Sequence, residues 1–247
     1  MVLSRSKFHF IGIGGIGMSG LAELLHNMGA TISGSDASEN EQVQKLQKLG
    51  VHVFKGHSKN NVGEVDTVVY SSAIPPTNPE LLEAKARKIP IISRAEVLGE
   101  VMRLKRGIAV AGSHGKTTTT SLVASIFIKA QTDPTVVVGG RLDLIKSNAF
   151  LGKGEWLIAE ADESDGSFRR LSPEISIITN IDDDHMDYYH SYENLQKAFL
   201  EFAHLVPFYG FVVVCGDDLR TRTLFSQFDK RVLFYGFHES NDYYLKK

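Results

Sequence analysis

A glycine turn between an apolar run and a helical run is the feature that most constrains the fold of this chain. Residues 107–111 predict a buried strand, and residues 121–127 predict a helix. We expect the turn between them to hold the phosphates of ATP, because backbone N–H groups and a helix N-terminus attract phosphate oxygens. Lys116 is then expected to contact the terminal phosphates, and the Thr117 hydroxyl to bind Mg²⁺. The predicted ATP-binding residues are Gly112, Ser113, His114, Gly115, Lys116, Thr117 and Thr118.

Short apolar runs alternate with helix-length segments along almost the whole chain, which predicts βαβ units and parallel sheets. We therefore expect an α/β protein of two consecutive parallel-sheet domains, a Rossmann-like domain over residues 1–97 and a P-loop-like ATPase domain over residues 98–247. The expected strands are 8–14, 31–35, 52–55, 67–71 and 89–93 in the first domain, and 107–111, 135–138, 156–160, 175–180, 210–215 and 232–235 in the second. Residues 242–247 look like the start of a further strand, so we expect the second domain to be truncated.

A second glycine loop, Gly-x-Gly-x-x-Gly, follows the first expected strand and precedes a helix. Asp36 ends the next expected strand, as in dinucleotide-binding folds where an acid accepts hydrogen bonds from ribose hydroxyls. The loop predicts a diphosphate-bearing ligand; NAD and a nucleotide-sugar both remain open, and so does a turn that binds nothing. Ser71 and Ser72 follow another strand and either bind this ligand or form a simple turn, and His57 is a weaker candidate. The predicted contacts are Gly12, Gly14, Gly15, Ile16, Gly17, Asp36, Ser71 and Ser72.

Acidic and polar residues follow two further apolar strands. Glu160 ends one strand and is the best candidate for a Mg²⁺ ligand, since an acid at a strand end beside a phosphate loop is where the cation is held. We interpret the other acids of this run, Asp162, Glu163 and Asp165, as solvated loop charges. His185 follows the other strand, and we expect it to act as a metal ligand or as a phosphate contact. Asn180, in the same segment, either orients the substrate or holds the turn.

The bulk composition excludes several classes of protein. A net charge of −2 and a pI near 6.5 argue against a nucleic-acid-binding surface. No apolar run approaches the roughly 20 residues of a membrane span, and we find no signal peptide, so we expect a cytoplasmic protein without a membrane contact. Cys215 is the single cysteine, which excludes an internal disulfide. Its apolar neighbours predict a buried thiol rather than a nucleophile.

Four motifs, at residues 12–20, 112–120, 160–168 and 179–187, resemble the Mur ligase family, the ATP-dependent amide-forming enzymes of peptidoglycan precursor synthesis. The phosphate loop supports this, because the common G-x-x-x-x-G-K-[ST] loop needs glycine where this chain has Val110, and the shorter form occurs in this family. The resemblance implies a three-domain enzyme of which this chain holds the first domain and most of the second. It also implies that L-alanine is joined to the lactyl carboxylate of UDP-N-acetylmuramate through an acyl phosphate.

The resemblance also implies roles for single residues. Lys116 would neutralise the β- and γ-phosphates, Thr117 and Glu160 would hold one Mg²⁺, and His185 would hold a second; Lys116, Glu160 and His185 are thus the implied catalytic residues. Asn180 is grouped with the substrate contacts. Two alternatives stay open: a recycling ligase that attaches an intact tripeptide to the same UDP-sugar, and a non-catalytic module that binds a nucleotide-sugar or NAD. Because a third domain is expected to be missing, we expect this chain to bind ligands with little or no ligation.

Overall fold

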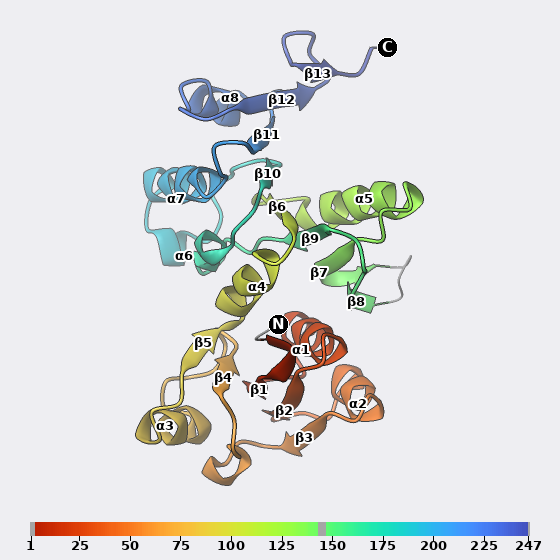
Figure 1. Cartoon of the computed structure of the whole chain (residues 1–247). Helices are drawn as coiled ribbons and strands as arrows, with labels where there is room; N and C mark the ends of the chain where they lie inside the picture. The colour runs from red at the N-terminus through yellow and green to blue at the C-terminus, as the bar shows by residue number, and fades with distance from the viewer. Residues whose placement is uncertain (1–2, 143–146, 247) are drawn as a thin grey trace. The chain divides into compact units, whose positions relative to one another are not determined.

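The computed structural model describes residues 3–142 and 147–246. Contacts between residues divide the chain into two compact units. Unit 1 comprises residues 1–98 and 136–152, and unit 2 comprises residues 99–135 and 153–247. The first sheet is parallel and the second is mixed, because it contains one antiparallel pair, and helices accompany both. The predicted α/β class is therefore confirmed. The path of the chain through both units can be followed by colour in Figure 1.

Unit 1 is built on a five-stranded parallel sheet with the strand order β3-β2-β1-β4-β5. The strands are β1 (Lys7–Ile11), β2 (Thr31–Asp36), β3 (His52–Lys55), β4 (Thr67–Tyr70) and β5 (Ile91–Ser93). The helices are η1 (Leu3–Arg5), α1 (Ile16–Asn27), α2 (Glu41–Lys48), η2 (Lys59–Asn61) and α3 (Pro79–Ala86). Strand order reverses between β1 and β4, and the carboxyl ends of strands at such a point are where open α/β sheets bind ligands.

An antiparallel hairpin of β7 (Thr135–Leu142) and β8 (Ser147–Phe150) supplies the remaining part of unit 1. β8 packs against α1, where the Asn148 side-chain amide donates to the Ile16 carbonyl. Gly20 permits this approach, because a Cβ there would lie 2.9 Å from Asn148 Nδ2. The sequence pattern grouped residues 135–138 with the second series of strands. The strand order of the second sheet agrees with this grouping, because β7 and β8 follow β9 in it. By their contacts, residues 136–152 are nevertheless assigned to unit 1.

Unit 2 is built on parallel strands in the order β13-β12-β11-β10-β6-β9. These are β6 (Arg106–Ala111), β9 (Trp156–Glu160), β10 (Ile175–Ile178), β11 (Phe211–Cys215), β12 (Val232–Gly236) and β13 (Tyr243–Tyr244). The helices are α5 (Lys116–Lys129), η3 (Ser167–Arg170), α6 (Met186–Tyr189), α7 (Tyr192–His204) and α8 (Leu219–Phe225). Helix α4 (Arg94–Met102) contains the sequence boundary between the units, which falls after residue 98. β6 has parallel neighbours on both sides, and all of its residues after Arg106 are buried.

An aromatic cluster fixes the acidic loop after β9 to the core of unit 2. Helix α7 buries Leu195, Ala198, Phe199, Phe202 and Ala203, which recur every three or four residues along one face. Phe168 packs against two of them, with ring centroids 5.3 Å from Phe199 and 5.0 Å from Phe202. The loop that carries the predicted acids is therefore tied down at both ends, by β9 and by Phe168.

Two expectations concern single features of the chain. Cys215 is half-buried rather than fully buried, because β11 alternates and its inward positions are Val212 and Val214. Among the helices in residues 3–142 and 147–246, none is both long and apolar enough to cross a bilayer.

Candidate active site

The phosphate loop (residues 112–118) joins β6 to the N-terminus of α5. Gly115 caps the helix in a left-handed conformation, with φ 81°, which favours glycine because it has no Cβ. The helix begins at Lys116, and the Gly115 carbonyl accepts the Thr119 N–H at 2.9 Å. The first N–H groups of α5 therefore lie in the loop itself, where they suit an anionic ligand.

The segment after β10 holds the phosphate loop in shape. The Asn180 side chain accepts from His114 N at 2.8 Å and donates to His114 O at 2.9 Å, and Thr179 Oγ1 donates to the same carbonyl at 2.7 Å. The Ser113 hydroxyl accepts from Asp182 N at 2.9 Å. Both ends of the Asn180 amide are thus occupied, which supports its role in holding the turn. Its contact with substrate stays a prediction.

Lys116 lies back over its own loop and pairs with a buried acid. Its Nζ donates to Gly112 O at 2.8 Å, to Ser113 O at 3.4 Å and to Glu163 Oε1 at 2.7 Å. The Glu163 side chain has no exposed surface, so the interpretation of this residue as a solvated loop charge is wrong. Burial raises the pKa of the Glu163 carboxyl, while the hydrogen bond and charge of Lys116 act in the opposite direction. His185 Nε2 lies 3.6 Å from the same oxygen.

Thr117 and Glu160 face each other across the carboxyl ends of β6 and β9. The Thr117 hydroxyl lies 3.1 Å from Glu160 Oε1 and 3.0 Å from Oε2. This pair was predicted as Mg²⁺ ligands, and the chemistry fits: Mg²⁺ prefers oxygen ligands and is commonly held by one or two carboxylates together with substrate phosphates and water. Within the described ranges, no cluster of three or more His, Cys, Asp or Glu residues is arranged to hold a metal.

His185 stands at the start of α6 in a left-handed conformation, with φ 55°. A non-glycine residue in that region is uncommon and marks a site of local constraint. Its backbone N–H donates to Asp184 Oδ1 at 2.8 Å, and its Nε2 lies 3.6 Å from Asp184 Oδ2. The ring is therefore next to Glu163 and Asp184, whereas Glu160 contacts Thr117. The structure therefore brings these side chains to one sheet edge in two groups. One is Thr117 with Glu160, and the other is Lys116 and His185 around Glu163.

The glycine loop of unit 1 (residues 12–17) joins β1 to α1. Gly12 has φ 78°, and the N–H groups of Gly12 and Ile13 donate to the carbonyl of Ser35 on β2. Gly14 N donates to Asp36 Oδ2 at 2.8 Å, so the predicted acid touches the loop directly. Gly15 caps α1. The loop and Asp36 are thus preformed around the N-terminus of α1, and the contact of Asp36 with a ribose stays a prediction.

Ser71 and Ser72 follow β4 on the other side of the strand-order reversal. The Ser71 carbonyl accepts from Ile74 N at 2.9 Å, and its hydroxyl accepts from Ala73 N at 3.4 Å. This turn lies against the glycine loop, because a Cβ at Gly12 would be 3.2 Å from the Ile74 side chain. Ser72 is exposed. The structure therefore groups both serines with the glycine loop while leaving the simple-turn alternative open for Ser71.

Comparison with protein families identifies the chain's relatives. The family model "Mur ligase family, catalytic domain" matches residues 7–106. The model "Mur ligase middle domain" matches residues 110–247, which is more than half of the chain. The chain belongs to the Mur ligase family. It is 64% identical over 242 residues to UDP-N-acetylmuramate–L-alanine ligase of Bdellovibrio bacteriovorus, covering 98% of this chain and 53% of the relative. The ligase of that name from Aquifex aeolicus is 51% identical over 98% of this chain and 54% of the relative.

Solved structures of Mur ligases share this fold. UDP-N-acetylmuramate–alanine ligase from Thermotoga maritima superposes with a TM-score of 0.85 at 33% identity, over 98% of this chain and 55% of that one. UDP-N-acetylmuramate:L-alanyl-γ-D-glutamyl-meso-diaminopimelate ligase from Neisseria meningitides superposes with a TM-score of 0.86 at 25% identity. The match covers 94% of this chain and 78% of that one. This Mur ligase chain spans about half the length of the curated relatives it matches.

Sequence reasoning missed a buried acid in unit 1 of this Mur ligase chain. Glu80, in the first turn of α3, is fully buried and accepts from Ser35 Oγ at 2.5 Å and Asn61 Nδ2 at 2.6 Å. His57 Nδ1 lies 3.3 Å from it and His9 Nε2 lies 3.7 Å from it. Burial alone would raise the pKa of Glu80, but hydrogen bonds to its carboxylate lower the pKa to about 2. His57 therefore takes part in the network around Glu80, and its contact with a ligand stays a prediction.

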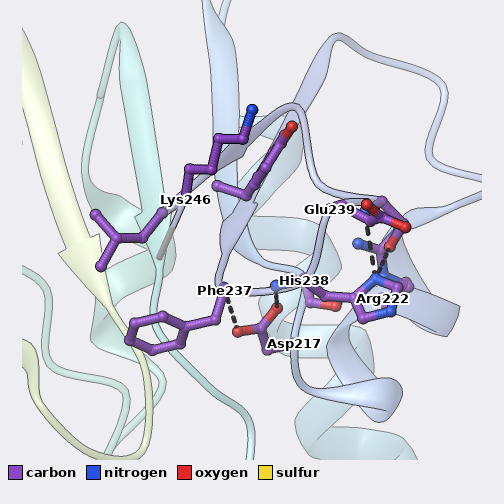
Figure 2. Close-up of a pocket in the computed structure, with 10 residues that line it drawn as sticks. Asp217, Arg222, Phe237, His238, Glu239 and Lys246 are labelled. Atoms are coloured by element: carbon purple, nitrogen blue, oxygen red, sulfur yellow. Dashed lines mark hydrogen bonds between the residues drawn. The ribbon is translucent and has the colours of Figure 1, made fainter.

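A surface pocket of unit 2 of the Mur ligase chain lies apart from the predicted residues (Figure 2). Asp217 shapes it by accepting from Phe237 N at 2.6 Å and His238 N at 3.1 Å. Its lining is Gly216, Asp217, Arg222, Phe237, His238, Glu239, Ser240, Tyr244, Leu245 and Lys246. None of the phosphate-loop or acidic-loop residues lines this pocket, so it gives no support to the predicted site.

Gly112→Ala is expected to destabilise the Mur ligase chain more than Gly115→Ala. Both glycines have positive φ, 141° and 81°, which costs about 1–2 kcal/mol for an alanine. A Cβ at Gly112 would also fall 1.9 Å from Thr179 Oγ1, whereas a Cβ at Gly115 meets nothing within 4 Å. Urea unfolding of both variants measures the difference, which we expect to be about 1–3 kcal/mol. Equal losses of stability would contradict the close approach of Thr179 to the loop.

Proposed function

We propose that this chain forms the nucleotide-sugar-binding and ATP-binding parts of a UDP-N-acetylmuramate–L-alanine ligase, an ADP-forming enzyme of peptidoglycan precursor synthesis. The observation that carries the proposal is the position of Lys116 and Thr117 at the start of α5, opposite Glu163 and Glu160. The relatives at 64% and 51% identity have this name, whereas the structure named for the tripeptide substrate is 25% identical. L-Alanine is therefore favoured over the tripeptide as the amine substrate.

The proposed domains are a UDP-sugar-binding domain over residues 1–97 and an ATP-binding domain over residues 98–247. The family matches support a change of domain between residues 106 and 110, and the contacts divide the chain first at residue 98. The hairpin at residues 136–152 is the exception, because its contacts lie within unit 1. We also propose a cytoplasmic location, since the reaction draws on the ATP of the cell.

The proposed reaction begins when the lactyl carboxylate of UDP-N-acetylmuramate attacks the γ-phosphorus of ATP, and the bond to the departing ADP oxygen breaks. The L-alanine amine then attacks the acyl carbon of the acyl phosphate, loses a proton, and phosphate leaves as the amide forms. Activation is needed because a carboxylate is a poor electrophile at neutral pH. Lys116 would offset the negative charge of the β- and γ-phosphates, a preorganised electrostatic role.

Divalent cations are part of the proposal. Thr117 and Glu160 would hold one Mg²⁺ through oxygen ligands, and His185 would contribute to holding a second. Bound cations would reduce the repulsion between an anionic carboxylate and an anionic triphosphate. In this arrangement Asn180 and Ser113 keep the phosphate loop in shape through the hydrogen bonds that they make to each other's segments.

The glycine loop of unit 1 would bind the diphosphate of the UDP-sugar. The proposed contacts are Gly12, Gly14, Gly15, Ile16, Gly17, Asp36, Ser71 and Ser72. The N-terminus of α1, which begins at Ile16, supplies positive potential for the phosphates. NAD carries the same diphosphate, so a module that binds NAD without ligation is the second candidate. The phosphate loop and the Thr117–Glu160 pair would have no role in such a module.

Calorimetric titration of this chain with UDP-N-acetylmuramate, with NAD as the control ligand, tests the proposal. We expect heat of binding for the UDP-sugar and none for NAD. We also expect little or no L-alanine-dependent ADP release from this chain alone, since it spans about half of its relatives. Binding of NAD alone would reject the ligase assignment, and robust L-alanine-dependent ADP release would reject the expectation that a further domain is needed.

A further inference from the structure

Glu163 differs from the acids around it in being completely buried. It lies in the run that follows β9, and its side chain has no exposed surface. Its backbone carbonyl accepts from the Tyr189 hydroxyl and from Gly166 N, so the main chain is held on both sides. Its second carboxylate oxygen, Oε2, is buried and has no hydrogen-bond partner among residues 3–142 and 147–246. A buried acceptor without a donor is costly, so this oxygen does not add to the stability of the chain.

The Lys116 ammonium is fully committed to protein acceptors. It carries three N–H donors, and three oxygens surround it: Gly112 O, Ser113 O and Glu163 Oε1. The shortest of these contacts, 2.7 Å, is to Glu163, and the Lys116 side chain is 15% exposed. A buried carboxylate at this distance offsets part of the positive charge that the ammonium presents to a phosphate.

Glu160 adds a second negative charge at the same sheet edge, beside Thr117. Lys116 is therefore outnumbered by the two carboxylates that accompany it. A metal-free triphosphate brings several negative charges to the phosphate loop and is repelled by the excess of carboxylates over ammonium groups. A triphosphate that carries a bound cation has less negative charge and is repelled less. The contribution of Glu163 is strengthened by burial, because its side chain has no exposed surface and the effective dielectric constant is lower away from water.

We propose that Glu163 strengthens the dependence of nucleotide binding on a divalent cation, by offsetting part of the Lys116 charge so that the phosphate loop discriminates against metal-free nucleotide. The inference rests on the proposed nucleotide function of the loop. Glu163 acts here as a specificity-determining residue through Lys116. The cation itself would be held by Thr117 and Glu160, which Glu163 does not replace.

Asp165 supplies a matched control for Glu163. It lies two residues further along the same loop, is only partly buried, and accepts from Ser167 N at 2.9 Å. Asp165→Asn removes the same charge as Glu163→Gln from nearly the same stretch of chain. Glu163→Gln keeps the shape of the side chain and an oxygen that can still accept from Lys116. A difference between the variants therefore reports the pairing with Lys116 rather than net charge.

The experiment is a fluorescence or calorimetric titration of this chain with ATP, once in EDTA and once with excess Mg²⁺. For the unchanged chain we expect binding with Mg²⁺ and much weaker binding in EDTA. Glu163→Gln is expected to bind metal-free ATP on the order of tenfold more tightly than the unchanged chain does. The ratio of the affinity with Mg²⁺ to the affinity in EDTA therefore becomes smaller. Asp165→Asn is expected to leave that ratio unchanged. A structural defect alone would weaken binding in both conditions.

Each other outcome has a defined meaning. If the unchanged chain binds ATP with Mg²⁺ but Glu163→Gln leaves the affinity for metal-free ATP the same or lower, the inference is wrong and the proposed function stands. If the unchanged chain binds no ATP in either condition, the nucleotide function of the loop is rejected together with the inference. Thermal unfolding establishes that each variant is folded; should Glu163→Gln not fold, Glu163→Ala is titrated with the same expected increase and the same interpretation.

Discussion

Lys116→Ala is expected to lower the affinity of this chain for Mg²⁺–ATP and to reduce any ATP turnover by about 10²–10³, to below detection for this chain. Lys116 is the one ammonium in the phosphate loop, and removing a preorganised charged donor from a site of developing charge costs about 10²–10³ in rate. The change also leaves the buried Glu163 carboxylate without its 2.7 Å partner. Titration with ATP and an assay of ADP release, on this chain and on a full-length ligase that contains it, measure both effects.

Lys129→Ala is the control for this prediction. Lys129 lies in the last turn of the same helix and is exposed, so its loss removes an equal charge without touching the loop. We expect the Lys129 variant to bind ATP as the unchanged chain does. Turnover that survives Lys116→Ala would show that the assignment of the phosphate loop is wrong, whatever the affinity for ATP.

Local spacing predicted the parts of the site that are built from one strand and the loop after it. The phosphate loop, with Thr117 in it, could be found because it follows the apolar strand β6, and Glu160 because it ends the apolar strand β9. Parallel strands deliver such residues to one edge, so their proximity follows from the fold class. Asp36 was found in the same way and does contact the glycine loop, at 2.8 Å from Gly14 N.

The buried acids could not be predicted, because burial of a carboxylate depends on partners far away in the sequence. Glu163 looks like its neighbours Asp162 and Asp165, and only Lys116, 47 residues earlier, sets it apart. Glu80 resembles an ordinary acid in the first turn of a helix, and Ser35, 45 residues earlier, is its partner. The packing of the β7–β8 hairpin on α1 is likewise a tertiary contact without a local signal.

Glu80→Ala is expected to destabilise the chain by about 3–5 kcal/mol, the usual cost of breaking a buried charged cluster by removing one member. The carboxylate accepts from Ser35 Oγ, Asn61 Nδ2 and the Ser58 N–H, and all three donors would lose it at once. It therefore joins β2, η2 and α3 around a point that has no exposed surface. Urea unfolding followed by circular dichroism measures the loss, and the more conservative Glu80→Gln is expected to lose less because it keeps one acceptor.

The same residue predicts how stability depends on pH. The pKa of Glu80 is about 2 in the folded chain and about 4.5 when unperturbed, so the unfolded chain takes up the proton first as the pH falls. The stabilisation is therefore complete above about pH 4.5 and is lost progressively towards pH 2; a shift of this size corresponds to about 3 kcal/mol. We expect the free energy of unfolding to fall over this interval less steeply in Glu80→Gln than in the unchanged chain.

Glu83→Gln is the matched control, since Glu83 lies on the same helix one turn later and is partly exposed. The Glu83→Gln variant should lose as much free energy of unfolding in acid as the unchanged chain does, because the Glu83 side chain is partly exposed and is not part of the buried network. If Glu80→Gln and Glu83→Gln follow the same curve between pH 4.5 and pH 2, the loss belongs to other carboxylates and Glu80 is not ionised in the folded chain. If only Glu80→Gln flattens the curve, the buried network beneath the glycine loop is held together by that single negative charge.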